Sequence, residues 1–339
     1  MRRGPSRETA WLNVDLGETH DAAFAQRIAA LMQARPILRA HRDVLRQGAI
    51  FYARNLDMLW LADWARRMSG SQAALVYECL DVHRFMTRAD GLGAMMRGIE
   101  RRLLNQASAV VISSPAFGRE YFDKRQAGLA RTILIENRLP WGFEYGARPV
   151  APVARTGPIR IGWFGNLRCR RSLGLLLALA DRFPDRVELV LRGAPARTEL
   201  GDFEAALAGR ANVSFGGRYA WPGDLASIYG DVDLVWAGDF HDPGANSKWL
   251  LPNRLYEGGY YCAPPIAPAD SETGRWIEAR GFGFTLAEPL ETTFPEFISS
   301  LDRMRISEAR ARLAKTSEAV FLQPKDELKA VLDLARGAR

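Results

Sequence analysis

The feature that most constrains the fold is an alternation of short apolar runs with helix patterns, which occurs in both halves of the 339-residue chain. In the first half, helix patterns at 58–68 and 92–106 separate runs rich in β-branched, aromatic and small apolar residues. Strands that alternate with helices at this spacing form βαβ units and a parallel sheet. The predicted strands of the first half are 49–53, 73–77, 109–112 and 133–135.

A second series follows a segment, 141–158, that is rich in Pro, Gly and Ala and is typical of an interdomain linker. Its predicted strands are 159–164, 187–192, 231–236, 264–267 and 282–286. We therefore predict two Rossmann-like domains that face a cleft, with ligands at the carboxyl ends of the strands. The predicted division is an N-terminal domain 1–145, a linker 146–158, a second domain 159–325 and a C-terminal helix or tail 326–339.

Composition and charge exclude several classes of protein. The chain contains no run of about 20 apolar residues and no apolar segment after its basic start, so neither a membrane span nor a secretory signal is expected. Three widely spaced cysteines indicate free thiols in a reducing cytoplasm. Residues 1–150 hold 22 basic against 15 acidic side chains, whereas the remainder holds 24 of each. Without a nucleic-acid module, this asymmetry favours the inner face of a membrane as the anionic partner.

The sharpest motif is the segment 251–268, which contains a predicted helix with Glu257 and then a Pro-Pro strand. A carboxylate there can accept hydrogen bonds from two vicinal hydroxyls, whereas the plainer interpretation is a surface Glu on an amphipathic helix. The segment resembles the donor-site helix and strand of family 4 glycosyltransferases, which have the GT-B fold. The resemblance places Glu257 at the second glutamate of the family's E-x7-E motif, which binds the ribose of the nucleotide.

The resemblance extends to neighbouring residues, with one departure. Trp249 stands where the family has its first glutamate, and we expect the loop Asn246-Ser247-Lys248 to replace it. Asn253, Arg254 and Leu255, at the start of the helix, complete this part of the expected donor site.

A basic turn follows the first strand of the second series, in the sequence Gly165-Asn166-Leu-Arg168-Cys-Arg170-Arg171. Guanidinium groups beside a helix start can bind a diphosphate, although any one of these arginines can equally be a solvated side chain. The turn resembles the family's pyrophosphate site, with the basic pair drawn from Arg168, Arg170 and Arg171. The next strand ends in Gly193, which the resemblance implies allows close approach of the base.

Polar residues end the predicted strands of the first half. The resemblance implies a catalytic or acceptor-side group after the second strand, for which Asp81 and His83 are the candidates, while His83 can equally be a satisfied, partly buried histidine. Arg54, Asn55, Ser113 and Asn137 are expected to line the cleft. On the helix 92–106, Arg97, Arg101 and Arg102 accompany an apolar stripe, which fits either an interfacial helix or a core-facing one.

The resemblance spans most of residues 49–320 and is strongest to exopolysaccharide glycosyltransferases of the succinoglycan type, through Tyr-Ala-Arg-Asn-Leu-Asp-Met, Val-Tyr-Glu-Cys-Leu-Asp-Val-His-Arg and Ser-Ser-Pro-Ala-Phe. Such proteins normally begin with a further strand, Gly-rich turn, helix and strand. That opening is not recognisable here, so either the start codon is misplaced or the first Rossmann unit is incomplete.

The resemblance implies an enzyme that transfers a hexose from a nucleotide-sugar to a polyprenyl-diphosphate-linked saccharide or polysaccharide. Together with the composition and the charge asymmetry, it predicts a cytoplasmic protein that is peripheral at the inner face of the cell membrane. It implies retention of configuration and catalysis without a metal or other cofactor. Two alternatives stay open: a catalytically impaired pseudo-glycosyltransferase, and a nucleotide-sugar 2-epimerase on the same fold. A NAD enzyme is disfavoured because neither half contains the full G-x-G-x-x-G fingerprint.

Overall fold

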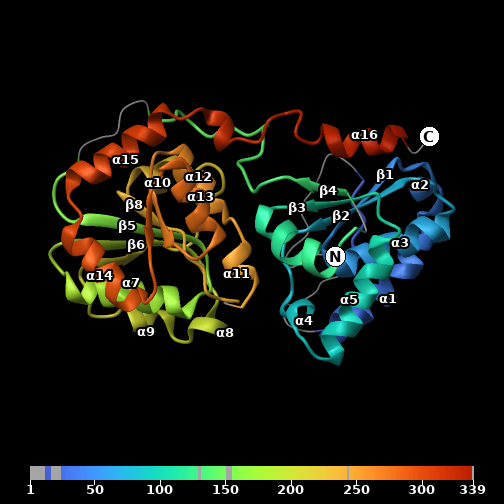
Figure 1. Ribbon diagram of the computed structural model, residues 1–339, viewed down its shortest axis with the longest axis horizontal. Helices are drawn as coiled ribbons and strands as arrows, with labels where there is room; N and C mark the ends of the chain where they lie inside the picture. Colours follow the sequence, from blue (N-terminus) through green and yellow to red (C-terminus); the bar gives the residue numbers. More distant parts are fainter. Residues whose placement is uncertain (1–11, 17–23, 129–130, 150–154, 243, 338–339) are drawn as a thin grey trace. The chain divides into compact units, whose positions relative to one another are not determined.

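The computed structural model describes residues 12–16, 24–128, 131–149, 155–242 and 244–337. The chain divides into two compact units, each with its own parallel sheet (Figure 1). Unit 1 comprises Met1–Ser113, Gly118–Ile135 and Leu328–Arg339, and unit 2 comprises Ser114–Phe117 and Glu136–Glu327. Among the helices so described, none combines the length and apolar character that a membrane span requires.

The described part of unit 1 is built on a four-stranded parallel sheet in the order β1-β2-β3-β4. The predicted parallel sheet is therefore confirmed in this half. The strands are β1 (Ile50–Arg54), β2 (Ala74–Cys79), β3 (Ala109–Ile112) and β4 (Arg131–Leu134).

Helices cover this sheet because its two central strands are apolar on both faces. On one face, Val331 of α16 packs with Val76, Val111 and Ile133. On the side of α5, Glu100 accepts hydrogen bonds from the Tyr77 and Tyr121 hydroxyls. The α-helices of unit 1 are α1 (Phe24–Ala40), α2 (Arg42–Gln47), α3 (Asn55–Ser69), α4 (Arg84–Thr87), α5 (Gly91–Leu104), α6 (Asp123–Arg125) and α16 (Lys329–Gly337), and a π-helix η1 (Phe117–Phe122) spans the boundary with unit 2.

The described part of unit 2 is built on a six-stranded parallel sheet in the order β10-β9-β8-β5-β6-β7. Within unit 2, the chain first forms β5 in the centre of the sheet, and β6 and β7 follow on one side of it. The chain then crosses to the other side of β5, where β8, β9 and β10 follow in order toward the edge. The strands are β5 (Ile159–Leu167), β6 (Val187–Pro195), β7 (Val213–Phe215), β8 (Leu234–Trp236), β9 (Pro265–Pro268) and β10 (Phe284–Leu286).

Side chains of the central strands alternate between two apolar cores. Ile161 and Trp163 lie in the core beneath α7 and α14, whereas Phe164 lies in the core beneath α10, α12 and α13. These two helical layers are visible on opposite sides of the sheet in Figure 1. The helices of unit 2 are α7 (Arg170–Arg182), α8 (Arg197–Leu200), α9 (Phe203–Leu207), α10 (Leu225–Gly230), α11 (Asn246–Trp249), α12 (Asn253–Tyr260), α13 (Glu272–Arg280), α14 (Leu290–Ser300), α15 (Arg303–Lys315) and the 3₁₀-helix η2 (Glu318–Val320).

The unit boundaries differ from the predicted division at 146–158 and 326–339. The main segment of unit 2 begins at Glu136, because the residues that follow are tied to this unit. Leu139 bridges to Leu322, and the Arg148 guanidinium donates to the carbonyls of Tyr260, Leu313 and Thr316. At the other end, the expected tail contains α16, which packs on the sheet of unit 1. Pro and Gly content alone did not reveal these long-range contacts.

Candidate functional site

The strand order of unit 2 fixes where a ligand can bind. In an open parallel sheet, ligands occupy the crevice at the carboxyl ends of the strands where the direction of winding reverses. Here that point lies between β5 and β8, which are paired through Ile161–Leu234 and Gly162–Val235. The residues that follow these two strands therefore form the candidate site of unit 2.

Glycines bring the backbones of β5 and β6 together at this edge. Gly165 has φ 102° and Gly193 has φ 136°, both in the region that side chains disfavour. A Cβ atom on Gly193 would lie 1.9 Å from the carbonyl oxygen of Gly165. Close packing against β5 is therefore sufficient to require a glycine at this position. The expected role of Gly193, which is to allow close approach of the base, is not needed to explain this residue.

Arg254 joins the ends of the two switch-point strands. Its guanidinium donates to the carbonyl of Phe164 in β5 at 3.1 Å and to that of Gly238, just after β8, at 3.3 Å. This places a positive charge at the switch point, on the first turn of α12. Arg254 was predicted as a donor-site residue, and this is where the structure places it.

Asp239 lies beside Arg254 and was not singled out by the sequence. Its Oδ1 accepts hydrogen bonds from the Ser247 hydroxyl at 2.7 Å and from the His241 amide at 2.8 Å. Burial alone would raise the pKa of Asp239, but Arg254 and these hydrogen bonds outweigh it, and the pKa lies below its usual value. Asp239 is therefore an anion that orders the basic groups around it.

The three arginines of the basic turn have different surroundings. Arg168 is partly exposed, and its guanidinium lies 3.9 Å from Oδ2 of Asp239, at the switch point. Arg170 instead donates to the carbonyl of Glu199, at 2.7 Å from its Nη2. Of the expected diphosphate cluster, the structure thus brings Arg168, and not Arg170, to the other site residues.

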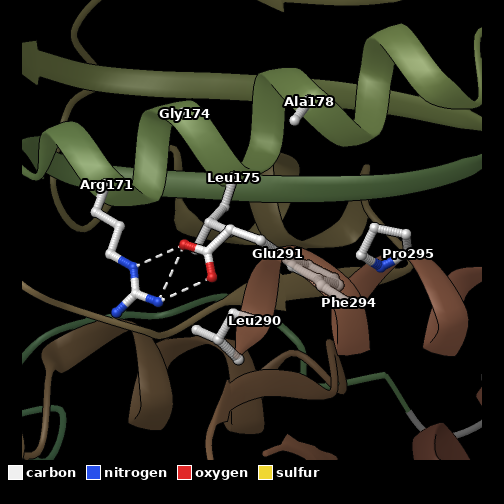
Figure 2. Close-up of a pocket in the computed structure, with 8 residues that line it drawn as sticks. All are labelled: Arg171, Gly174, Leu175, Ala178, Leu290, Glu291, Phe294 and Pro295. Atoms are coloured by element: carbon white, nitrogen blue, oxygen red, sulfur yellow. Dashed lines mark hydrogen bonds and ion pairs between the residues drawn. The ribbon is translucent and has the colours of Figure 1, made fainter. Parts of the chain in front are cut away.

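Arg171 is held at the start of α7 by two ion pairs. It pairs with Glu288 at 2.7 Å and Glu291 at 3.1 Å, and its guanidinium lies 4.6 Å from the centre of the Phe240 ring. Figure 2 shows it at a groove of about 230 Å³ between α7 and α14, where Glu291 faces it and Leu175 and Phe294 are among the lining residues. Its expected role as a phosphate ligand is therefore corrected to a link between α7 and α14.

Glu257 is 5% exposed and both of its carboxylate oxygens have donors. Oε2 accepts from the Tyr229 hydroxyl at 2.7 Å, and Oε1 accepts from Nε1 of Trp221 at 3.2 Å. Burial raises the pKa of Glu257 above its usual value, although the two hydrogen bonds and Arg254 oppose the rise. The plainer interpretation, a surface Glu, is wrong: Glu257 is a buried acid one helical turn from Arg254.

The remaining predicted donor residues divide between site and scaffold. Ser247 is hydrogen-bonded to Asp239 and lies at the edge of the site, next to the buried Asn246. Asn166 and Asn253 are exposed. Two expectations are corrected: Lys248 forms a surface ion pair with Asp270 at 2.6 Å, and Leu255 is a fully buried residue of the apolar core beneath α12.

Unit 1 has a cavity of about 570 Å³ beside β1 and α3. Three predicted residues, Arg54, Asn55 and Asp81, line it at the ends of β1 and β2. Asn55 has φ 70°, an uncommon conformation for a residue with a side chain, and its buried Oδ1 has no hydrogen-bond partner. The other lining residues are Leu16, Arg27, Leu38, Leu45, Phe51, Tyr52, Ala53, Asp57, Met58, Leu61, Ala62, Ala65 and Leu80.

The other predicted residues of the first half lie outside this cavity lining. His83 is exposed, and its Nδ1 accepts a hydrogen bond from the Phe85 amide at 3.3 Å. Ser113 is buried, and Asn137 belongs to unit 2, where its amide donates to the carbonyl of Leu251 at 3.1 Å. Within the described ranges, no three His, Cys, Asp or Glu side chains form a group that could hold a metal ion.

The chain is 42% identical over 277 residues to the succinoglycan biosynthesis protein ExoL of Rhizobium meliloti (strain 1021), which covers 80% of this chain and 69% of that protein. No protein-family model matches the chain.

Two solved structures share its fold. The HepE protein of Anabaena, in complex with UDP and glucose, superimposes with a TM-score of 0.63 at 16% identity, over 89% of this chain and 80% of that one. Sucrose-phosphate synthase of Thermosynechococcus elongatus superimposes with a TM-score of 0.67 at 14% identity, over 92% and 79%. The predicted GT-B fold, with two Rossmann-like domains, is confirmed.

Proposed function

The chain belongs to the family of the succinoglycan biosynthesis protein ExoL and is a glycosyltransferase of exopolysaccharide biosynthesis, and from this premise we propose that unit 2 binds its nucleotide-sugar donor at the β5–β8 switch point. The observation that carries the proposal is the meeting of Arg168, Arg254 and Glu257 at that edge. HepE, which shares this fold, has been crystallised in complex with UDP and glucose.

The chemistry of the three side chains suits the parts of a nucleoside diphosphate. The Arg168 guanidinium, beside the start of the 13-residue helix α7, supplies positive charge for the diphosphate. The Glu257 carboxylate accepts hydrogen bonds from the ribose hydroxyls. When the acceptor hydroxyl attacks the anomeric carbon, the departing diphosphate gains negative charge, and a fixed guanidinium stabilises that charge without rearrangement.

We propose that this guanidinium charge replaces a metal ion and that a hexose is transferred with retention of configuration. Full activity in the presence of EDTA and an unchanged anomeric configuration, followed by proton NMR of the product, are the expected results. Loss of activity in EDTA with recovery on addition of Mg²⁺ contradicts the first statement, and an inverted product contradicts the second.

The cavity of unit 1 is proposed to hold the acceptor, a polyprenyl-diphosphate-linked saccharide. Its lining is largely apolar, with polar groups of Arg54, Asn55 and Asp81 at the strand ends. Of the two predicted catalytic candidates, Asp81 belongs to this lining and His83 lies outside it. An Asp81→Asn variant that binds the donor normally but transfers no sugar is the expected result, and full transfer by this variant removes Asp81 from catalysis.

An anionic membrane surface is the proposed location of unit 1, at the inner face of the cell membrane. On α5, Leu92, Met95 and Ile99 are exposed and Leu103 is buried, so the first turns of the stripe face outward while its end packs in the core. Arg97 and Arg101, which were predicted to accompany this stripe, donate to the carbonyls of Arg88 and Arg125. An exposed apolar stripe in a unit with excess positive charge suits an anionic lipid surface.

Titration of the protein with UDP in a calorimeter tests the donor proposal. Saturable binding that is weakened in a folded Glu257→Gln variant is expected. No heat with any nucleoside diphosphate contradicts it.

A further inference from the structure

The two hydrogen-bond donors of Glu257 differ in their surroundings. Tyr229 is fully buried, with its ring 5.0 Å from Phe164 and 6.0 Å from Tyr261 between ring centres. Trp221 is 41% exposed and lies in the loop between β7 and α10. The hydroxyl of Tyr229 is therefore a fixed internal partner, whereas the indole of Trp221 is the partner that borders on solvent.

Aromatic side chains hold the indole in place from the side. The Trp221 ring meets Phe143 edge-on, with the centres 4.9 Å apart, and Tyr145 at 6.2 Å. Phe143 is itself half exposed. Edge-on contacts of this kind are individually weak, so they can hold the indole against Glu257 without locking it there.

We infer that Trp221 is a positioning residue that closes over Glu257 and competes with the ribose of the donor for Oε1. This inference rests on the proposed donor site. Since Glu257 is 5% exposed and Tyr229 fills its inner side, a ribose hydroxyl reaches the carboxylate from the side of Trp221. The indole N–H must then leave Oε1, and the ribose hydroxyl takes its place.

The size of the effect follows from the bond that is exchanged. A hydrogen bond of this kind has a net free energy equivalent to a factor of about 2 to 12 in an equilibrium constant. The closed form lowers the apparent affinity for the nucleotide by that factor, because only the open form binds it. Removing the indole N–H while keeping an aromatic ring should therefore tighten binding.

The first experiment compares Trp221→Phe with wild type by calorimetry, with UDP and 2′,3′-dideoxyuridine diphosphate as probes. We expect the variant to bind UDP about 2 to 12 times more tightly and the dideoxy analogue with unchanged affinity. Trp141→Phe is the matched control, because Trp141 is also half exposed and has no contact with Glu257 among the described hydrogen bonds. Equal or weaker binding of UDP by Trp221→Phe overturns the inference.

The second experiment reads the effect in the wild-type protein and uses the variant only for assignment. The indole N–H signal of Trp221, assigned by its disappearance in Trp221→Phe, should shift in the wild-type protein when UDP binds and stay in place with the dideoxy analogue. A signal that does not move at saturating UDP overturns the inference.

The two proposals fail in different ways. If wild-type protein binds no UDP, the donor site itself is refuted, and the role of Trp221 falls with it. If UDP binds and loses affinity without its ribose hydroxyls, while Trp221→Phe behaves as wild type, only the role of Trp221 is refuted.

Discussion

Replacing Arg168 by alanine should weaken the binding of a nucleoside diphosphate far more than that of the nucleoside. Arg168 lies 3.9 Å from Asp239, too far for a direct hydrogen bond, so its guanidinium retains donors for a phosphate. By contrast, Arg170 donates to a backbone carbonyl and Arg171 to two glutamates. The three neighbouring arginines therefore form a natural comparison set.

The expected magnitude comes from the hydrogen bonds that Arg168 would make. A hydrogen bond to a charged group contributes about 1.5–3 kcal/mol, which corresponds to a loss of about 13- to 160-fold in affinity for the diphosphate. Uridine has no phosphate, so its affinity should stay within about 2-fold. For Arg170→Ala, the affinity for UDP should also stay within about 2-fold.

Calorimetric titration of each variant with UDP, UMP and uridine provides the measurement. Thermal unfolding serves as the control for Arg171→Ala, since loss of the pairs with Glu288 and Glu291 should lower stability by less than about 1 kcal/mol at this exposed position. Equal losses for UDP and uridine in Arg168→Ala would show that the arginine supports the fold and not the phosphate. A larger loss in Arg170→Ala than in Arg168→Ala would refute the assignment.

Three further predictions concern stability and location. Glu257→Ala should lower the free energy of unfolding by about 2–4 kcal/mol in urea titrations, because two donors lose their acceptor, and a change below about 0.5 kcal/mol would contradict the buried network. Burial raises the pKa of Glu100, so in the folded protein this carboxyl keeps a proton that it releases in the unfolded chain. The contribution of this proton to the free energy of unfolding is complete below about pH 4.3 and is lost as the pH rises through the pKa of Glu100 in the folded protein. In Glu100→Gln this decline should be smaller, and identical pH profiles from urea unfolding would refute it. Met95→Glu with Ile99→Glu should abolish sedimentation with anionic vesicles at low salt, whereas Met304→Glu, at an exposed site of unit 2, should not; equal sedimentation of both would exclude the α5 stripe.

The sequence was sufficient for the parallel sheets and for the edge at which the site lies. Strand-helix alternation predicts parallel strands. A glycine near the end of β5, Gly165, and a basic residue directly after the strand, Arg168, mark the carboxyl edge. Arg254 and Glu257 were predicted from the resemblance of the segment 251–268 to the family's donor-site helix, and α12 places them one turn apart. These are local signals, and they survive in a single sequence.

The division of roles among the arginines was not predictable from the sequence. Glu288 and Glu291, which bind Arg171, lie 117 and 120 positions further along the chain. Trp221 likewise reaches Glu257 across 36 positions, from a loop without a recognisable motif. Asp239 gave one usable signal, since it follows closely after a predicted strand, but its partner Ser247 becomes apparent only in the folded loop.

The most direct test of the account measures release of nucleoside diphosphate from a panel of nucleotide-sugars, with a lipid extract of exopolysaccharide-producing cells as the acceptor. The account predicts acceptor-dependent release from at least one donor, with the sugar recovered in the lipid fraction, and a large loss of both in Arg168→Ala. Equal rates in wild type and Arg168→Ala, or release without any sugar in the lipid fraction, would contradict it.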